Sequence, residues 1–285
     1  MSGATLRTET GDGVRTIVFA RPDEYNTITP ALRDELSAAL DEADADDAVR
    51  AILLRAEGRA FCAGYGLDWS TEAQAAERSA DRVWDSVQDM AAMGSFVDVY
   101  MKLWYCRKPT IAAVQGWCIG GGTDMVLCAD LILAAESASF GYPPARVWGT
   151  PTTAMWVYRL GFQQAKRWLF TGDEIRARAA ERIGLALEVV PDDELEVHAS
   201  ALAQRIARLP LPQLVMLKAL CNQPAEAMGI AASRRLGTLF DGVARHTQEG
   251  LDFVDRAQEV GFRDAVRERD EPFGDYGSGS RSKRR

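Results

Sequence analysis

The chain has 285 residues, of which 47% are hydrophobic and 26% charged, and its formal net charge is -8. This composition is that of an ordinary globular protein, long enough to bury a substantial core in one large domain or in a domain with an appendage. The acidic balance argues against nonspecific nucleic-acid binding, and no apolar stretch is long enough to cross a bilayer.

Cysteine usage and the N-terminal residues bear on the cellular compartment. The scattered cysteines form no Cys-x-x-Cys pair and indicate reduced thiols that pack in apolar surroundings: Cys62, Cys106, Cys118, Cys128 and Cys221. The first ten residues lack the basic and apolar segments of a signal peptide, so we expect a cytoplasmic protein. Neither a metal site nor a serine-type triad has support in the pattern of residues.

The first half of the chain alternates predicted strands and helices. β-branched and apolar residues predict a strand at Val14–Phe19, and Thr29 followed by Pro30 predicts a helix N-terminus. Continuous apolar runs, typical of strands covered on both faces, occur at residues 51–54, 110–114 and 131–134. Strands separated by helices imply crossover connections, so the predicted class is α/β with a mixed or parallel sheet.

The remaining segments are predicted to be mostly helical. Residues 70–107 carry no strand signal, and we expect a peripheral helical segment that either covers the substrate or is a solvated spacer. After Gly149, helices are predicted at residues 155–160, 164–170, 175–182, 193–209, 214–221 and 234–266. We expect a core at residues 1–192, a helical region at 193–275 and a disordered basic tail at 276–285.

Two bends rich in small residues carry the main chemical signal. Residues 61–68 and 116–124 each follow an apolar strand-like run, and their small side chains leave backbone amides unshielded. Two such amides aimed at one point form an oxyanion hole. Asp124 would stand beside the oxygen that they hold. This arrangement predicts chemistry at a carbonyl whose neighbouring carbon loses or gains a proton.

The same segments resemble those of a known family. The run Leu-Leu-Arg-Ala-Glu-Gly-Arg-Ala-Phe-Cys-Ala-Gly at residues 53–64, the glycines at 120–122 and Phe-Gly-Tyr-Pro at 140–143 resemble the crotonase superfamily, the enoyl-CoA hydratases and isomerases. The resemblance covers roughly residues 14–273. It implies a spiral of repeated β-β-α units, a C-terminal helical oligomerisation region, and trimers or hexamers. It also implies an acyl-CoA substrate, with coenzyme A as part of that substrate and no separate cofactor, and neither nucleic acid nor membrane as a partner.

The resemblance assigns catalytic roles to three residues. It implies that the thioester oxygen accepts hydrogen bonds from the amides of Tyr65 and Gly121. Gly121 also stands at a predicted helix N-terminus, where free amides and the helix dipole favour negative charge. Asp124 holds the place of the first of two glutamates with which family hydratases position water and move its protons. Some dienoyl-CoA isomerases resemble this chain in having aspartate there.

The place of the second glutamate lacks a carboxylate. Either Pro144 or Ala145 occupies it, and neither can carry a proton. Hydration by two carboxylates is therefore disfavoured, whereas isomerisation needs only one carboxylate beside a stabilised enolate. Thioester hydrolysis, decarboxylation and noncatalytic acyl-CoA binding stay open.

Several other residues are candidates for substrate binding. Tyr142 has a phenol near the incomplete turn, and Arg146 either binds an acidic acyl group, braces Asp124 or is an ordinary surface residue. Tryptophans either line an aromatic acyl pocket or pack in the core: Trp69, Trp84, Trp104, Trp117 and Trp148. Lys218 resembles a lysine that reaches CoA phosphates, often from a neighbouring subunit, or is a solvated helical residue. The expected acyl-CoA contacts are Arg21, Asn26, Ala63, Gly64, Asp68, Gly120, Tyr142, Pro144, Arg146, Trp148 and Lys218.

Overall fold

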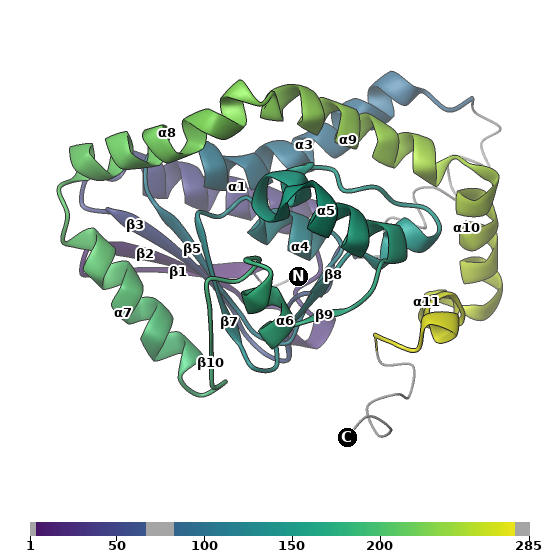
Figure 1. Cartoon of the computed structure of the whole chain (residues 1–285), viewed down its shortest axis with the longest axis horizontal. Helices are drawn as coiled ribbons and strands as arrows, with labels where there is room; N and C mark the ends of the chain where they lie inside the picture. Colours follow the sequence, from purple (N-terminus) through teal and green to yellow (C-terminus); the bar gives the residue numbers. More distant parts are fainter. Residues whose placement is uncertain (1–3, 67–82, 277–285) are drawn as a thin grey trace.

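The computed structural model describes residues 4–66 and 83–276 of the chain. The expectations for Asp68, Trp69 and residues 277–285 of the basic tail therefore lie outside the described residues. The expected disorder is wrong for Tyr276, the first residue of the predicted tail, because its ring packs against Trp117 and Arg146. In Figure 1 the strands form the centre, helices α8 (Leu211–Ala227) and α9 (Ile230–Arg245) run along the top, and α7 (Leu195–Ala207) lies at the lower left.

The strands form two sheets. The larger has the order β1-β2-β3-β5-β7-β10, in which β1 and β2 are antiparallel and the other neighbours are parallel. The smaller has the order β4-β6-β8-β9, and only β8 and β9 are antiparallel. The strands are β1 (Leu6–Gly11), β2 (Val14–Phe19), β3 (Ala51–Ala56), β4 (Ala60–Cys62), β5 (Thr110–Val114), β6 (Trp117–Ile119), β7 (Leu131–Ala135), β8 (Ser139–Gly141), β9 (Ile175–Arg176) and β10 (Glu188–Val190).

From β3 to β8, successive strands alternate between the two sheets. In each of the pairs β3 and β4, β5 and β6, and β7 and β8, the first strand joins the larger sheet and the second joins the smaller one. Helical turns connect one pair to the next. This repetition produces a spiral of β-β-α units, so the predicted α/β class and its repeated units are confirmed.

Helices surround the sheets and make up most of the C-terminal half. They are α1 (Pro30–Ala45), α3 (Ser86–Tyr105), α4 (Gly121–Val126), α5 (Met155–Thr171), α6 (Ala177–Arg182), α7, α8, α9, α10 (Gln248–Val260) and α11 (Phe262–Asp270), with short 3-10 turns η1 (Pro22–Glu24), η2 (Pro143–Arg146) and η3 (Glu271–Phe273). The predicted cap of the first helix is confirmed, because the Thr29 hydroxyl accepts the amide of Leu32 at 3.2 Å. The two helices expected near residues 155–170 are one element with a break at Gly161.

Two expectations about secondary structure are wrong. Ile175 was expected in a helix but lies in β9, because its backbone pairs with Phe140 of β8. Helix α3 was expected at the periphery, yet it is part of the core. Its buried side chains are Phe96, Val97, Val99, Tyr100, Met101, Leu103 and Trp104. The described part of residues 70–107 is thus neither peripheral nor a solvated spacer, and a substrate-facing role for it stays a prediction.

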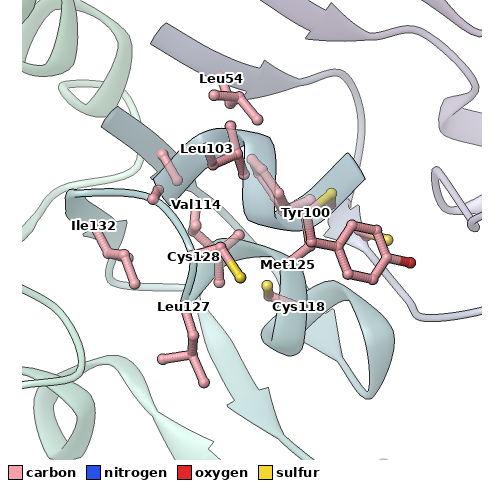
Figure 2. Close-up of a cluster of buried hydrophobic side chains, with 14 of the residues drawn as sticks. Leu54, Tyr100, Leu103, Val114, Cys118, Met125, Leu127, Cys128 and Ile132 are labelled. Atoms are coloured by element: carbon pink, nitrogen blue, oxygen red, sulfur yellow. The ribbon is translucent and has the colours of Figure 1, made fainter. Parts of the chain in front are cut away.

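The main apolar core lies between the β-β-α units. Figure 2 shows side chains from β3, α3, β5, β6, α4 and β7 meeting in it, among them Leu54, Leu103, Val114 and Ile132. A second apolar cluster lies where α7 covers the larger sheet, with alanines at helical spacing facing Leu53. Because small residues line that face of α7, the helix approaches the strands closely.

A buried cation ties the C-terminal segment to η2. The Arg146 side chain is 2% exposed and forms ion pairs with Asp270 and Asp275 at 2.8 Å, while its guanidinium stacks on Phe273 at 3.9 Å. Its Nε also donates to the Thr171 carbonyl at 3.0 Å. The expectation that Arg146 is a surface residue is wrong, and so is a role in bracing Asp124 or binding an acyl group, because its donors are taken by other partners.

We expect Arg146→Ala to lower the free energy of unfolding by about 3 to 5 kcal/mol, since it removes a cation shared by buried carboxylates. Chemical denaturation measures this change. The matched control is Arg256→Ala, because Arg256 pairs with Glu259 and Glu268 on an exposed surface, where ion pairs contribute little to stability. Equal, small losses in the two variants would contradict a structural role for the buried cation.

Candidate active site

Three turns lie together at one edge of the smaller sheet. Strands β4, β6 and β8 are parallel neighbours, so the turns that follow Cys62, Ile119 and Gly141 leave from the same edge. Crevices at the carboxyl ends of strands are the usual place for ligands in such folds. The two glycine bends and the Tyr142 turn, distant in the sequence, are therefore brought to one site.

The two bends touch each other. Gly64 has φ +92°, and a Cβ added to it would lie 3.0 Å from the Ile119 carbonyl oxygen and 3.8 Å from the Gly121 nitrogen. A Cβ at Gly122 would lie only 2.3 Å from the Cys62 carbonyl oxygen. Real Cβ atoms do not approach backbone oxygen as closely as 2.3 Å, so Gly122 cannot carry a side chain, and Gly64 combines a tight contact with a positive φ that favours glycine. The small residues that define the motif are thus needed for the close approach of β4 and α4.

The amides of Tyr65 and Gly121 stand free at this contact. Within residues 4–66 and 83–276, neither N–H donates a hydrogen bond, whereas the neighbouring amides of Gly66 and Gly120 donate to Ile28 and Gly141. Gly121 is the first residue of α4, where amides lack an intrahelical acceptor. The structure therefore places two unpaired donors on adjacent turns.

The Tyr65 side chain points into the protein. A Cβ at Gly121 would lie 2.7 Å from the Tyr65 ring, and the ring meets Phe96 edge-on at 5.6 Å between centroids. The Tyr65 hydroxyl accepts a hydrogen bond from Tyr100 at 3.1 Å and lies 3.4 Å from the Met93 sulfur. Burial raises the pKa of this phenol. The side chain thus fills space beneath the bend, and among the groups of Tyr65 only the backbone N–H lacks an acceptor in the described residues.

Asp124 is fully buried and held by neutral donors. Its Oδ2 accepts the Thr152 amide at 2.6 Å and the Thr152 hydroxyl at 2.9 Å, and its Oδ1 accepts the Trp156 indole N–H at 2.9 Å. No described cation forms an ion pair with it. Burial raises the pKa of Asp124 to about 6, although these hydrogen bonds act in the opposite direction. A carboxylate with this pKa can both take and give a proton near neutral pH.

Thr152 and Trp156 were not identified from the sequence. Trp156 lies within the helix predicted at residues 155–160, and Thr152 was assigned to no element. A threonine pair before a helix is an ordinary capping pattern, so no local signal distinguishes a donor to a distant carboxylate.

The turn that lacks the second carboxylate is closed by proline. The Pro144 carbonyl accepts the amides of Val147, Trp148 and Gly149, and its ring lies 3.7 Å from where a Cβ of Gly120 would be. Pro144 therefore faces the glycine bend, and its side chain carries no acidic group.

Tyr142 lies close to Asp124, but the phenol proton of Tyr142 is already donated in a hydrogen bond. The phenol donates to the Thr150 carbonyl at 2.7 Å, and its ring meets Trp156 edge-on. Burial, followed by the charge of Asp124, raises the pKa of this phenol. Tyr142 thus supports the turn that carries Thr152.

Two expected ligand contacts lie elsewhere in the protein. Trp148 stacks on Phe253 at 5.3 Å between ring centroids, within an apolar cluster of α10 and α11. The Lys218 ammonium pairs with Asp130 at 2.8 Å and donates to the carbonyls of Leu103 and Lys108. The solvated-lysine alternative is wrong, and a contact between Lys218 and CoA phosphates would require these bonds to break.

Arg21 and Asn26 build the loop before α1. The Asn26 side-chain amide donates to the carbonyls of Glu57 and Ala60 at 2.9 and 2.8 Å and accepts the Arg21 amide at 2.9 Å. The Ala63 amide donates to the Tyr25 carbonyl. These bonds fasten the loop to the first glycine bend, so both residues lie beside the site while the Asn26 side chain is fully engaged.

The structure also bears on the cysteines, on possible metal ligands and on membrane-spanning helices. All five cysteines are free, and Cys221 is exposed, so its expected burial is wrong. Across the described ranges, no group of three or more His, Cys, Asp or Glu side chains is arranged to hold a metal ion. None of the described helices combines the length and apolar character needed to cross a membrane.

Known proteins share both sequence and fold with this chain. The family model for enoyl-CoA hydratase/isomerase matches residues 9–260. A probable enoyl-CoA hydratase of Rhizobium meliloti is 35% identical over 246 residues, covering 83% of this chain and 89% of the relative. A crystal structure of an enoyl-CoA hydratase from Mycobacterium smegmatis has 44% identity and a TM-score of 0.90, with coverage of 96% of this chain and 95% of that chain.

A more distant structure agrees with these matches. An enoyl-CoA hydratase/isomerase from Xanthobacter autotrophicus Py2 is 29% identical, with a TM-score of 0.84 and coverage of 95% of this chain and 99% of that chain. Because the family model and the full-length relatives both cover most of the residues, the chain belongs to the enoyl-CoA hydratase/isomerase family of enzymes, within the crotonase superfamily.

Proposed function

We propose that this protein binds an acyl-CoA thioester and stabilises its enolate, with the amides of Tyr65 and Gly121 as the oxyanion hole and Asp124 as the acid and base at the α-carbon. The observation that carries the proposal is the pairing of two unused amides on touching bends with a buried carboxylate on the helix that begins at one of them. An amide donor of this kind contributes about 3 to 4 kcal/mol of transition-state stabilisation.

The reaction that fits this site is turnover of an enoyl-CoA through that enolate. Proton transfer at the α-carbon by Asp124 alone supports a shift of a 3-enoyl-CoA double bond. Hydration of a 2-enoyl-CoA requires, in addition, a group that takes a proton from water. Relatives at 29–44% identity carry the names enoyl-CoA hydratase or hydratase/isomerase, which supports an enoyl-CoA as the substrate.

We expect Asp124→Asn to abolish exchange of α-protons while leaving acyl-CoA binding intact, because the oxyanion hole survives and the base does not. The wild-type protein should incorporate deuterium from deuterated water into a saturated acyl-CoA such as butyryl-CoA, measured by NMR. The variant should do so at least about 100-fold more slowly. Its dissociation constant for the same acyl-CoA should change less than about threefold.

Backbone variants separate the amides from the side chains. Gly121→Pro deletes one donor and should reduce exchange by about 100- to 1000-fold. Tyr65→Phe keeps its amide and should stay within a few-fold of wild type. Equal rates for wild type and Asp124→Asn would reject the assigned base. Absence of exchange, of enoyl-CoA turnover and of binding for short, medium and long acyl chains would reject the function itself.

The exchange rate should depend on pH through Asp124. Since the base is the ionised carboxylate, the rate should rise between pH 5 and 7 with its midpoint near the pKa of about 6. Trp156→Phe removes an N–H that stabilises the charged form, so the pKa rises further and the midpoint should move upward by about one pH unit.

Trp168→Phe is the matched control for this shift. Trp168 lies on the same helix, α5, and its indole nitrogen is buried without a hydrogen-bond partner in the described part of the chain. Its substitution should leave the midpoint unchanged. A downward shift in Trp156→Phe, or the same shift in both variants, would contradict the proposed control of Asp124 by the Trp156 indole.

We also propose that the protein assembles into trimers or hexamers through α8 and α9. Exposed apolar side chains lie along these two helices and the turn between them: Met216, Leu217, Leu220, Met228, Leu236, Phe240 and Val243. Apolar surface of this kind is typical of interaction sites. Light scattering should give a mass three or six times that of the chain, and Leu220→Asp should lower it. A monomeric mass for the wild-type protein would contradict the proposal.

A further inference from the structure

Helix α9 lies against the segment that holds Asp124. A Cβ at Gly237 would lie 2.6 Å from the Pro151 carbonyl oxygen, so the helix backbone touches this segment directly. The Thr238 hydroxyl donates to the Thr152 carbonyl at 3.2 Å. Thr152 in turn donates its amide and hydroxyl to Asp124. One residue therefore separates α9 from the candidate catalytic carboxylate.

A second buried carboxylate follows on the same face of α9. Asp241 comes three residues after Thr238, which places it about one helical turn farther along that face. It is 6% exposed, and its Oδ2 accepts the Arg245 Nε at 3.0 Å. Its other oxygen accepts no hydrogen bond from the described residues. A carboxylate oxygen without a donor from the described residues can accept a hydrogen bond from a ligand or water.

Asp241 and Asp124 act on the same two phenols. The charge of each carboxylate raises the pKa values of Tyr65 and Tyr142, in both cases after the larger effect of burial. Tyr65 belongs to the first glycine bend and Tyr142 to the turn that lacks its acid. Both phenols thus respond to the charge of Asp241, although it is distant in the sequence from the segments that carry them.

The surroundings of Asp241 leave an excess of negative charge. Arg245 also donates to both oxygens of Asp89 on α3 at 2.8 Å, so one cation serves two carboxylates. His246 is the other ionisable neighbour from α9, and its Nδ1 contacts the Gly242 carbonyl while its ring stacks on Trp84.

We propose that Asp241 is the second acid–base carboxylate of this site and that it serves the β-carbon of the acyl group while Asp124 serves the α-carbon. The proposal rests on the enolate function given above. It places on α9 the second carboxylate, which is absent at Pro144 and Ala145.

With this assignment, every proton and electron pair of the hydration step is accounted for. Asp241 takes a proton from water as the water oxygen bonds to the β-carbon of a 2-enoyl-CoA. The electron pair of the double bond moves toward the thioester, whose oxygen becomes the enolate held by the two amides. Asp124, in its protonated form, gives its proton to the α-carbon. A proton then passes through solvent from Asp241 to Asp124, and both groups return to their starting forms.

The test compares two reactions of one variant. In Asp241→Asn, hydration of a trans-2-enoyl-CoA should fall at least about 100-fold, because the base for water is lost. Exchange of the α-protons of butyryl-CoA should stay within about threefold of wild type, because it needs only Asp124 and the amides. A merely structural role for Asp241 would not separate these two rates.

Asp89→Asn is the matched control, since it removes the other carboxylate from Arg245 and should leave hydration within about threefold. If Asp241→Asn does not fold, Asp241→Glu keeps the charge and should hydrate at an intermediate rate. Hydration at the wild-type rate in Asp241→Asn, equal losses in Asp241→Asn and Asp89→Asn, or a wild-type protein that exchanges but does not hydrate would overturn the proposal. Absence of exchange in the wild type would instead reject the enolate function.

Discussion

The close approach of the first glycine bend to α4 is the constraint on which the rest of this site depends. Parallel pairing of β4 and β6 brings the bends to one edge, and the absence of side chains at Gly64 and Gly122 lets backbone meet backbone. Two amides then remain without acceptors at the point of contact. Any side chain there would push the bends apart, so the same glycines that shape the fold also create its donors.

Burial of Asp124 is the second constraint, and it links the site to the C-terminal half of the chain. Removing a carboxylate from water without a cation costs free energy unless donors replace the water. Thr152 and Trp156 supply those donors, and α9 in turn fastens the Thr152 carbonyl. The protonation state of the candidate base is therefore set by residues from α5 and from the segment before it, supported by a helix that follows more than 80 residues later.

Local patterns predicted much of the fold. The apolar run of β2, the Thr29 cap and the strands at 110–114 and 131–135 agree with what residue types and spacing indicated. The β1–β2 hairpin was missed, although Asp12 and Gly13, both with positive φ, form the two-residue turn that this dipeptide favours. Because β1 is polar and exposed, no apolar run marked it. Ile175 was misassigned because pairing with β8, a nonlocal interaction, outweighed its helical surroundings.

By itself, the sequence determined the α/β class, the two glycine bends, the position of Asp124 and the lack of an acid at Pro144 and Ala145, because each is a local pattern of residue types. Only the tertiary structure decided which groups surround them. It placed Thr152 and Trp156 on Asp124, enclosed Arg146 among acidic groups, engaged Lys218 with Asp130, and joined α9, through Thr238, to the Thr152 carbonyl. The physical reason is that hydrogen bonds and ion pairs between distant segments depend on how helices pack over the sheets, which spacing along the chain does not encode.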